Sequence, residues 1–216
     1  KVLGKRKGEI KMEELLKRYP ALSVCRNDIE KAVNLLEDTY NAGGTLMFCG
    51  NGGSCADCDH IVGELMKGFL SLRPADSDAK AMLIEKYGDD GKRIADKLQR
   101  GIPAVSLAAH AGVMTAFAND VDPELIYAQM VYAYARPNDL VMGISTSGNS
   151  KNVVAALKTA SAIGLKTIGL TGNRECAMDE ICDVVIKVPE TETFKVQEYH
   201  LPVYHYLCAE LERRLF

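Results

Sequence analysis

Short apolar runs alternate with segments of helical periodicity along most of this chain. The runs are predicted to be buried strands, at residues 45–49, 104–107, 140–144, 167–170 and 183–188. Apolar residues three or four positions apart predict helices between them, at residues 54–68, 112–118, 124–134, 150–163 and from about 193 onwards. Continuously apolar strands that alternate with helices indicate a parallel sheet with both faces covered. We therefore expect an α/β fold, a three-layer sandwich around a five-stranded parallel sheet with flavodoxin-like nucleotide-binding topology.

A helical segment precedes the first strand. Residues 12–19 are predicted to form a helix that ends at Pro20. A second helix is indicated by Ile29, Val33, Leu36 and Tyr40, and the glycines at 43–44 end it. We accordingly expect an N-terminal helical segment over residues 1–43 and the α/β domain over residues 44–216.

Residues 71–100 interrupt the alternation of strands and helices. This stretch is strongly charged, and it is predicted to hold two short helices separated near Gly88–Gly91. We interpret it as a helical insertion, either at the surface or at a subunit contact. A solvated helical excursion without a function is an equally good interpretation.

Composition narrows the class of protein. Of the 216 residues, 47% are hydrophobic and 25% are charged, and the net charge is −3, as in an ordinary globular enzyme and unlike most nucleic-acid binders. No stretch approaches 18 apolar residues, and the basic N-terminus lacks the apolar core of a signal peptide. The seven cysteines lack the pattern of a small secreted protein. We expect a cytoplasmic protein that binds neither nucleic acid nor membrane.

Two polar loops follow strands and open directly into helices: GNGGS at residues 50–54 and STSGNS at residues 145–150. Ligands of open parallel sheets bind beyond the carboxyl ends of the strands. Free N–H groups and the helix dipole favour an anion there. Neither loop has the pattern of a Walker or dinucleotide motif, so we expect a small phosphate ester. Plain helix capping is the alternative interpretation.

Acid–base candidates lie on two of the predicted helices. His60 and Glu64 are four residues apart, which places them on one helix face. The last helix adds Gln197, Glu198, His200 and His205. Such side chains transfer protons near neutral pH, or hold zinc through nitrogen and oxygen atoms. A surface pair and a structural histidine are the alternatives, and we interpret His200, like His110, as structural.

A C-x-x-C pair lies inside the same region. Cys55 and Cys58, with Cys49 nearby, raise the hypothesis of a thiol metal or redox site. The opposing interpretation is that these cysteines pack as small apolar residues on a helix, and we favour it.

Five stretches together carry a resemblance to a known family: GNGGSCADCDHIVGEL, AFANDVDPE, GISTSGNSKNVVAALKTA, TIGLTGN and KVQEYHLPVYH. They resemble the sugar isomerase (SIS) domain family in its phosphoheptose isomerase form, from Gly44 to the C-terminus apart from residues 71–100. The resemblance implies aldose–ketose isomerisation of sedoheptulose 7-phosphate to D-glycero-D-manno-heptose 7-phosphate through an enediol(ate).

The resemblance also implies roles for particular residues. Glu64 corresponds to the general base and His205 to its acid/base partner. Zinc would lie among His60, Glu64, Gln197 and His205. Substrate contacts are implied for Asn51, Gly52, Gly53, Ser54, Asn119, Asp120, Ser145, Thr146, Ser147, Ser150 and Gln197. Members of this family are cytoplasmic homotetramers, so we expect a sugar-phosphate substrate and a homo-oligomer.

Other functions of SIS proteins remain open at the level of sequence. Non-catalytic relatives bind the bacterial replication initiator DnaA, or sense sugar phosphates in regulators. Such proteins are free to lose Glu64 and His205, and this chain has both. An isomerase for another sugar phosphate is a further alternative.

The spacing of two implied zinc ligands predicts a shared site. Gln197 and His205 are eight residues apart, so in one straight helix they lie roughly 12 Å apart along the axis and point about 80° apart. Either the helix starts after Gln197, or Pro202 bends it sharply, or the two residues come from different chains. We favour the last alternative and expect Glu64 and His205 to meet across a subunit interface.

Overall fold

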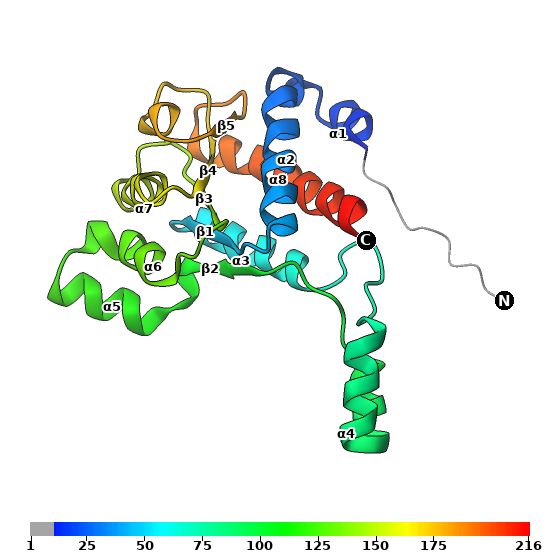
Figure 1. Cartoon of the computed structure of the whole chain (residues 1–216). Coiled ribbons are helices and arrows are strands. Elements are labelled where there is room, and N and C mark those ends of the chain that lie inside the picture. Colours follow the sequence, from blue (N-terminus) through cyan, green and yellow to red (C-terminus); the bar gives the residue numbers. More distant parts are fainter. Residues whose placement is uncertain (1–10) are drawn as a thin grey trace.

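The computed structural model describes residues 11–216 (Figure 1). Its centre is one sheet of five strands in the order β2-β1-β3-β4-β5, and every neighbouring pair is parallel. The strands are β1 (Leu46–Gly50), β2 (Ala104–Ser106), β3 (Leu140–Ile144), β4 (Lys166–Thr171) and β5 (Val184–Lys187). This order is the flavodoxin-like one, so the expected fold class is confirmed. The predicted strand ends differ from the observed ones by at most one residue, and Leu107 begins a short 3-10 helix, η2 (Leu107–Ala109), instead of ending β2.

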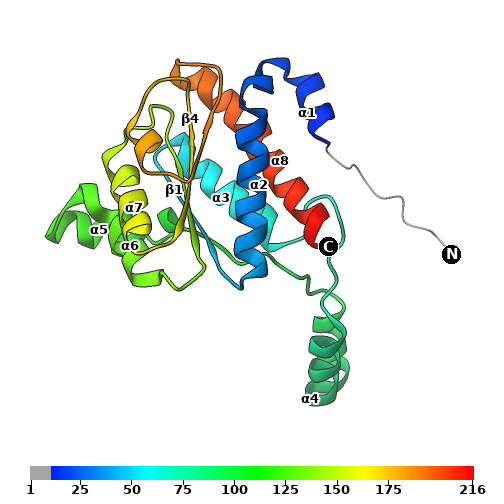
Figure 2. The same cartoon turned by 45° about the horizontal axis from the view of Figure 1, so that its top comes forward.

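Helices cover both faces of the sheet (Figures 1 and 2). One layer contains α1 (Met12–Arg18), η1 (Pro20–Cys25), α2 (Arg26–Asn41), α3 (Gly53–Met66) and α8 (Thr193–Leu215). The other contains α5 (Ala111–Asp120), η3 (Pro123–Leu125), α6 (Ile126–Tyr134), α7 (Lys151–Ala162) and η4 (Ala177–Glu180). The predicted helix over 124–134 thus starts with a 3-10 turn at Pro123, where the Asp122 carboxylate accepts the N–H of Glu124 at 2.7 Å.

Side chains of the central strands point alternately into two apolar cores. Leu46 and Phe48 belong to the core on the α2, α3 and α8 side, whereas Met47 and Cys49 belong to the core beneath α6 and α7. Alternate residues of a strand face opposite sides of the sheet. Since both faces are buried, the strands are apolar throughout, which is why the sequence shows runs without alternation.

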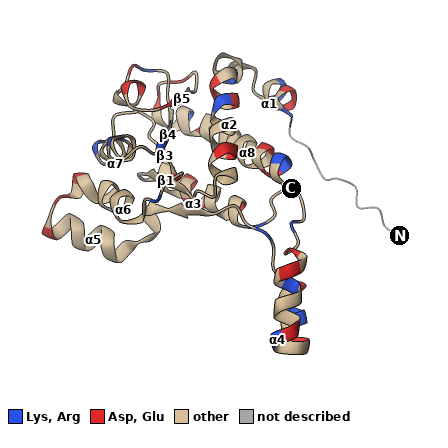
Figure 3. Ribbon diagram, viewed as in Figure 1, with Lys and Arg blue, Asp and Glu red and all other residues tan. Residues whose placement is uncertain are grey.

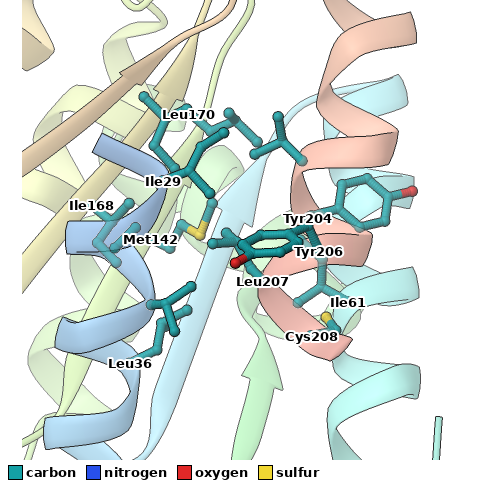
Figure 4. Packing of buried hydrophobic residues seen from close by; sticks show 14 of the residues in the cluster. Ile29, Leu36, Ile61, Met142, Ile168, Leu170, Tyr204, Tyr206, Leu207 and Cys208 are labelled. Atoms are coloured by element: carbon teal, nitrogen blue, oxygen red, sulfur yellow. The ribbon is translucent and has the colours of Figure 1, made fainter. Parts of the chain in front are cut away.

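The N-terminal segment, as far as the structure describes it, is part of the first core. Figure 4 shows Ile29 and Leu36 of α2 packed beside Met142 of β3 and Leu207 of α8. These side chains are at most 3% exposed. Burial of each such side chain contributes about 1.5–3 kcal/mol, so α2 is integral to the domain.

The insertion forms a projecting arm, α4 (Ser77–Ala95), that extends away from the sandwich (Figures 1 and 2). The two predicted helices are confirmed, because the backbone at Gly88 leaves the helical region at φ 56°. After this break the chain folds back, and Gly91 packs against the backbone of Leu83 too closely to accommodate a Cβ atom. Acidic and basic residues are mixed along the arm (Figure 3).

The C-terminal helix α8 passes through Pro202 without interruption and lies beside α3. The sharp bend considered for Pro202 is therefore wrong. A helix that starts after Gln197 is also wrong, because α8 begins at Thr193. Among the described residues, no helix is both long enough and apolar enough to cross a membrane.

Candidate active site

The two polar loops meet at the carboxyl edge of the sheet. Gly50 and Ile144, the last residues of β1 and β3, are register partners on neighbouring strands. The amide side chains of Asn51 and Asn152 exchange hydrogen bonds of 2.8 and 2.9 Å between the loops. The expectation that both loops lie at one edge is thus confirmed.

Hydroxyl groups gather in the second loop. Ser145 Oγ lies 2.9 Å from Ser150 Oγ and 3.4 Å from Ser147 Oγ. Ser150 is the N-terminal cap residue of α7, yet its hydroxyl pairs with Ser145 instead of capping the helix. Thr146 is fixed through its carbonyl, which accepts the Gly172 N–H at 3.2 Å. The start of α7 therefore combines hydroxyl donors with helix N–H groups, as an anion site requires.

Gln197 joins the first loop. Its Nε2 atom lies 2.6 Å from the point where a Cβ on Gly53 would be, so this side chain packs directly against the start of α3. Gly52, the residue before Gly53, has a φ of 55°, in the left-handed region that favours glycine. We call Asn51–Ser54, Ser145–Ser150 and Gln197 the loop site.

A second group of polar residues lies further along α3. His60 Nε2 is 3.3 Å from Glu64 Oε1, and the His60 and His205 rings meet edge to face with centroids 5.0 Å apart. His205 Nε2 is buried without a hydrogen-bond partner among the described residues. Burial lowers the pKa of His205, and the nearby His60 lowers it further. We call His60, Glu64 and His205 the acid–base cluster.

The acid–base cluster is assembled within one chain. Since α8 lies beside α3, His205 reaches His60 without any contribution from a neighbour. The expectation that Glu64 and His205 come from different chains is therefore not met. Gln197, in contrast, contacts α3 at Gly53, seven residues or about 10 Å of helix before His60.

The implied zinc ligands are consequently divided between two places. Across residues 11–216, no group of three or more His, Cys, Asp or Glu side chains is arranged to hold a metal ion. The donors of the acid–base cluster nevertheless fit zinc chemically, since His60 Nε2 faces a Glu64 oxygen and His205 Nε2 is buried without a partner. Gln197 does not reach them.

The remaining candidates lie outside both groups. Asn119 donates to Asp120 at 2.8 Å, and in the described chain neither hydrogen bonds to a loop. Glu198 is exposed. His110 contacts the Tyr134 hydroxyl at 3.1 Å. His200 is buried in the core, and desolvation lowers its pKa to about 4 despite a smaller opposing effect of the Thr171 backbone.

The C-x-x-C cysteines do not form a reactive thiol site. Cys49 and Cys58 are fully buried. Burial raises the pKa of the Cys49 thiol to about 12 and also raises those of Cys58 and Cys55. Thiolates, the reactive and metal-binding form, are therefore disfavoured. This agrees with cysteines that pack as small apolar residues.

Three neighbours of the acid–base cluster escaped the sequence analysis. Tyr204 and Asp57 contact one another beside His60, and Lys67 Nζ lies 3.1 Å from Glu64 Oε2. Helical spacing could have indicated two of these neighbours. Asp57 lies three residues before His60, and Lys67 lies three residues after Glu64. Tyr204 was indistinguishable from the apolar residues of the same buried stripe.

Comparisons with known proteins show which proteins this chain is similar to. Residues 101–206 match the model of the SIS domain. A phosphoheptose isomerase of Geotalea daltonii is 40% identical over 87% of this chain and 84% of its own length, and one of Akkermansia muciniphila is 33% identical over 92% and 91%. The solved structure of phosphoheptose isomerase GmhA from Neisseria gonorrhoeae is similar with a TM-score of 0.72 and 26% identity, covering 93% of this chain and 94% of that one.

Proposed function

Because this chain belongs to the phosphoheptose isomerase family of SIS-domain proteins, we propose that it converts sedoheptulose 7-phosphate to D-glycero-D-manno-heptose 7-phosphate. The observation that carries the proposal is the acid–base cluster, in which a half-buried His60 and a more buried Glu64 adjoin His205. We also propose a cytoplasmic location.

Glu64 and His205 divide the proton transfers of the reaction. Glu64 removes a proton from C1 of the ketose and returns it to C2, while neutral His205 accepts the proton on O1 and passes it to O2. The sum is an aldose, with no net gain or loss of protons. Neutral His205, which burial favours, is the form that accepts a proton. A positioned base and acid of this kind contribute about 10²–10⁴-fold each.

The loop site binds the phosphate. Ser145, Ser147 and Ser150 supply hydroxyl donors, and the start of α7 supplies N–H groups and a partial positive charge. The phosphate is remote from the reacting carbons, and anchoring it holds those carbons in the orientation that the reaction needs. Asn51, Gln197 and the glycines of the first loop border the same space.

Zinc is the metal that the acid–base cluster would hold, through His60, Glu64 and His205. The donors are nitrogen and oxygen atoms without thiolate, which suits Zn²⁺. A bound zinc ion would supply polarisation of the carbonyl and stabilise charge on the enediolate. Metal analysis of the purified protein before and after chelation tests this assignment, and full activity of metal-free protein would contradict it.

The two groups of residues lie at different points along α3. Eleven residues of α3 separate Gly53 from Glu64, which is about 16 Å of helix. The eight bonds from C1 to phosphorus span only about 10 Å at about 1.3 Å each. We therefore propose a homo-oligomer, a tetramer as in the family, in which the loop site of one chain faces the acid–base cluster of another.

Subunit exchange tests this arrangement. Glu64→Gln protein is mixed with Ser147→Ala/Ser150→Ala protein, and mixed sites that combine both native halves restore activity. The matched control mixes Glu64→Gln with His205→Ala, which share one cluster and should show no recovery. Absence of recovery in the first mixture, with exchange proven by mass spectrometry, contradicts the proposal.

The test of the activity itself is the product formed from sedoheptulose 7-phosphate, followed by NMR. An aldose 7-phosphate that appears with wild-type protein and not with Glu64→Gln protein supports the function. Binding without turnover would indicate the non-catalytic alternatives, a sugar-phosphate sensor or a DnaA-binding protein. Faster turnover of another ketose phosphate would reassign the substrate.

A further inference from the structure

Tyr204 connects the acid–base cluster to a carboxylate that no step of the reaction uses. It is only 1% exposed and extends from α8 toward α3. Its hydroxyl lies 3.0 Å from His60 Nδ1 and 3.3 Å from Asp57 Oδ1. The Tyr204 ring also meets the His60 ring at 74° with centroids 5.5 Å apart. The phenol is thus held between two side chains of the same helix.

The direction of these hydrogen bonds follows from an inventory of donors. An ionised carboxylate only accepts, so Tyr204 donates its proton to Asp57. The hydroxyl oxygen then accepts from His60, whose Nδ1 must carry the hydrogen. His60 Nε2 is left with a lone pair.

That lone pair faces Glu64 Oε1 at 3.3 Å. Two acceptors at this distance repel unless a proton or a cation lies between them. The chain Asp57–Tyr204–His60 therefore leaves Nε2 available for the group that belongs between His60 and Glu64. Partners that orient a ligand histidine in this way are worth about 10- to 100-fold in metal affinity or activity.

We propose that Tyr204 and Asp57 are positioning residues that fix the Nδ1–H tautomer and the ring orientation of His60, so that Nε2 is directed at Glu64. This inference rests on the proposed isomerase function for its catalytic consequence only. The tautomer itself is a property of the free protein and is measured without substrate.

The experiment compares Tyr204→Phe with Tyr206→Phe. Tyr206 lies two residues further along α8 and is also buried, so its substitution removes a similar hydroxyl that does not contact His60. Two-bond ¹H–¹⁵N correlation spectra of chelator-treated protein report the tautomer of each histidine, and a His60→Gln variant assigns the His60 signals. Steady-state kinetics with sedoheptulose 7-phosphate provide the second readout.

In wild-type and Tyr206→Phe protein, His60 should be the Nδ1–H tautomer. In Tyr204→Phe protein it should shift to a mixture or to Nε2–H, and kcat should fall by about 10- to 100-fold with little change in KM. Asp57→Asn, which keeps the Tyr204 hydroxyl, should give a smaller change in both readouts and provides the test if Tyr204→Phe does not fold. An unchanged His60 tautomer in these variants would overturn the proposal, whereas a tautomer shift in a protein that lacks turnover would leave it intact and reject only the isomerase function.

Discussion

Two polar clusters lie along the same pair of helices, α3 and α8, and they differ in how completely their hydrogen bonds are satisfied. Near the C-terminal ends of both helices, Arg73 pairs with Glu212 at 2.7 Å, and both side chains are at most 2% exposed. The Glu212 carboxylate also accepts the N–H groups of Phe69, Leu70 and Ser71 at 2.7–2.9 Å. Arg73 donates in addition to the backbone carbonyls of Leu65 and Glu64.

The acid–base cluster is the opposite case. The His60–Glu64 contact is long at 3.3 Å, His60 is 43% exposed, and His205 Nε2 has no partner in the described part of the chain. Buried polar groups are normally satisfied, so an unsatisfied one calls for an explanation. The Arg73–Glu212 pair satisfies its charges with protein atoms, whereas the acid–base cluster leaves capacity for substrate or metal.

The contacts of Glu212 also determine its pKa. Burial alone would raise the pKa of Glu212, but the N–H of Phe69 and the Arg73 guanidinium outweigh it, and the pKa is lowered. Glu212 is therefore held as a carboxylate and cannot exchange protons near neutrality. The Arg73–Glu212 pair is therefore structural. Arg73 also donates to the backbone carbonyls of Leu65 and Glu64 at the C-terminal end of α3.

The largest expected effect is on turnover. Glu64→Gln keeps the shape of the side chain but removes the base, so kcat should fall by about 10³-fold or more, within the range for general base catalysis. The free energy of unfolding should remain close to that of wild type, because the ion pair of Glu64 is with Lys67, whose side chain is 60% exposed. Steady-state kinetics and urea denaturation measure both quantities, and a near wild-type rate would remove Glu64 as the base.

The reciprocal change is Arg73→Met. It leaves the Glu212 carboxylate buried without its counter-ion, which should lower the free energy of unfolding by about 3–5 kcal/mol. Arg93→Met is the matched control, because Arg93 pairs with Asp90 at the surface of the arm with 73% of its side chain exposed, and its loss should matter little. Equal urea midpoints for the two variants would contradict a stabilising role of the buried Arg73–Glu212 pair.

His200 is another buried polar residue of α8, and its contribution to stability depends on pH. With a folded-state pKa of about 4 against 6.5 when unfolded, His200 is neutral in the fold. Its contribution is fully present above pH 6.5 and is lost as the pH falls from 6.5 towards 4, by about 3 kcal/mol in total. His200→Leu should flatten the stability profile over this window. An unchanged stability profile in His200→Leu protein would contradict this assignment.

The fold was predictable from the sequence because the three central strands, β1, β3 and β4, are buried on both faces. The run LVMGI over 140–144 contains no polar residue, and β3 has these same limits. Boundaries shifted where local chemistry decided them. The helix expected from residue 124 begins as a 3-10 turn because Pro123 and the Asp122 side chain set its start.

The site was predictable only in part. Helical spacing placed His60 and Glu64 on one face, and the loops could be placed at one sheet edge from topology. Spacing could not tell which points of α3 the C-terminal helix would contact, so the assignment of Glu64 and His205 to different chains was wrong. The role of Tyr204 depends on a contact between residues 144 positions apart, which no local pattern encodes.

The smallest expected effect concerns the loop site, which, unlike the Arg73–Glu212 pair, should gain its missing partner from solution. Inorganic phosphate at ten times its Kd stabilises the folded protein by about 1.4 kcal/mol, or roughly 3–6 °C in Tm for a domain of this size. Ser147→Ala/Ser150→Ala removes two of the hydroxyl donors and should abolish most of this shift. Ser161→Ala, an exposed serine near the other end of α7, should retain it. Differential scanning calorimetry with and without phosphate measures the shift, and an undiminished shift in the double variant would place the anion elsewhere.

Glu64→Gln should show the full shift, because Glu64 lies about 16 Å along α3 from the loop. That result would separate binding of the phosphate from the chemistry of the acid–base cluster.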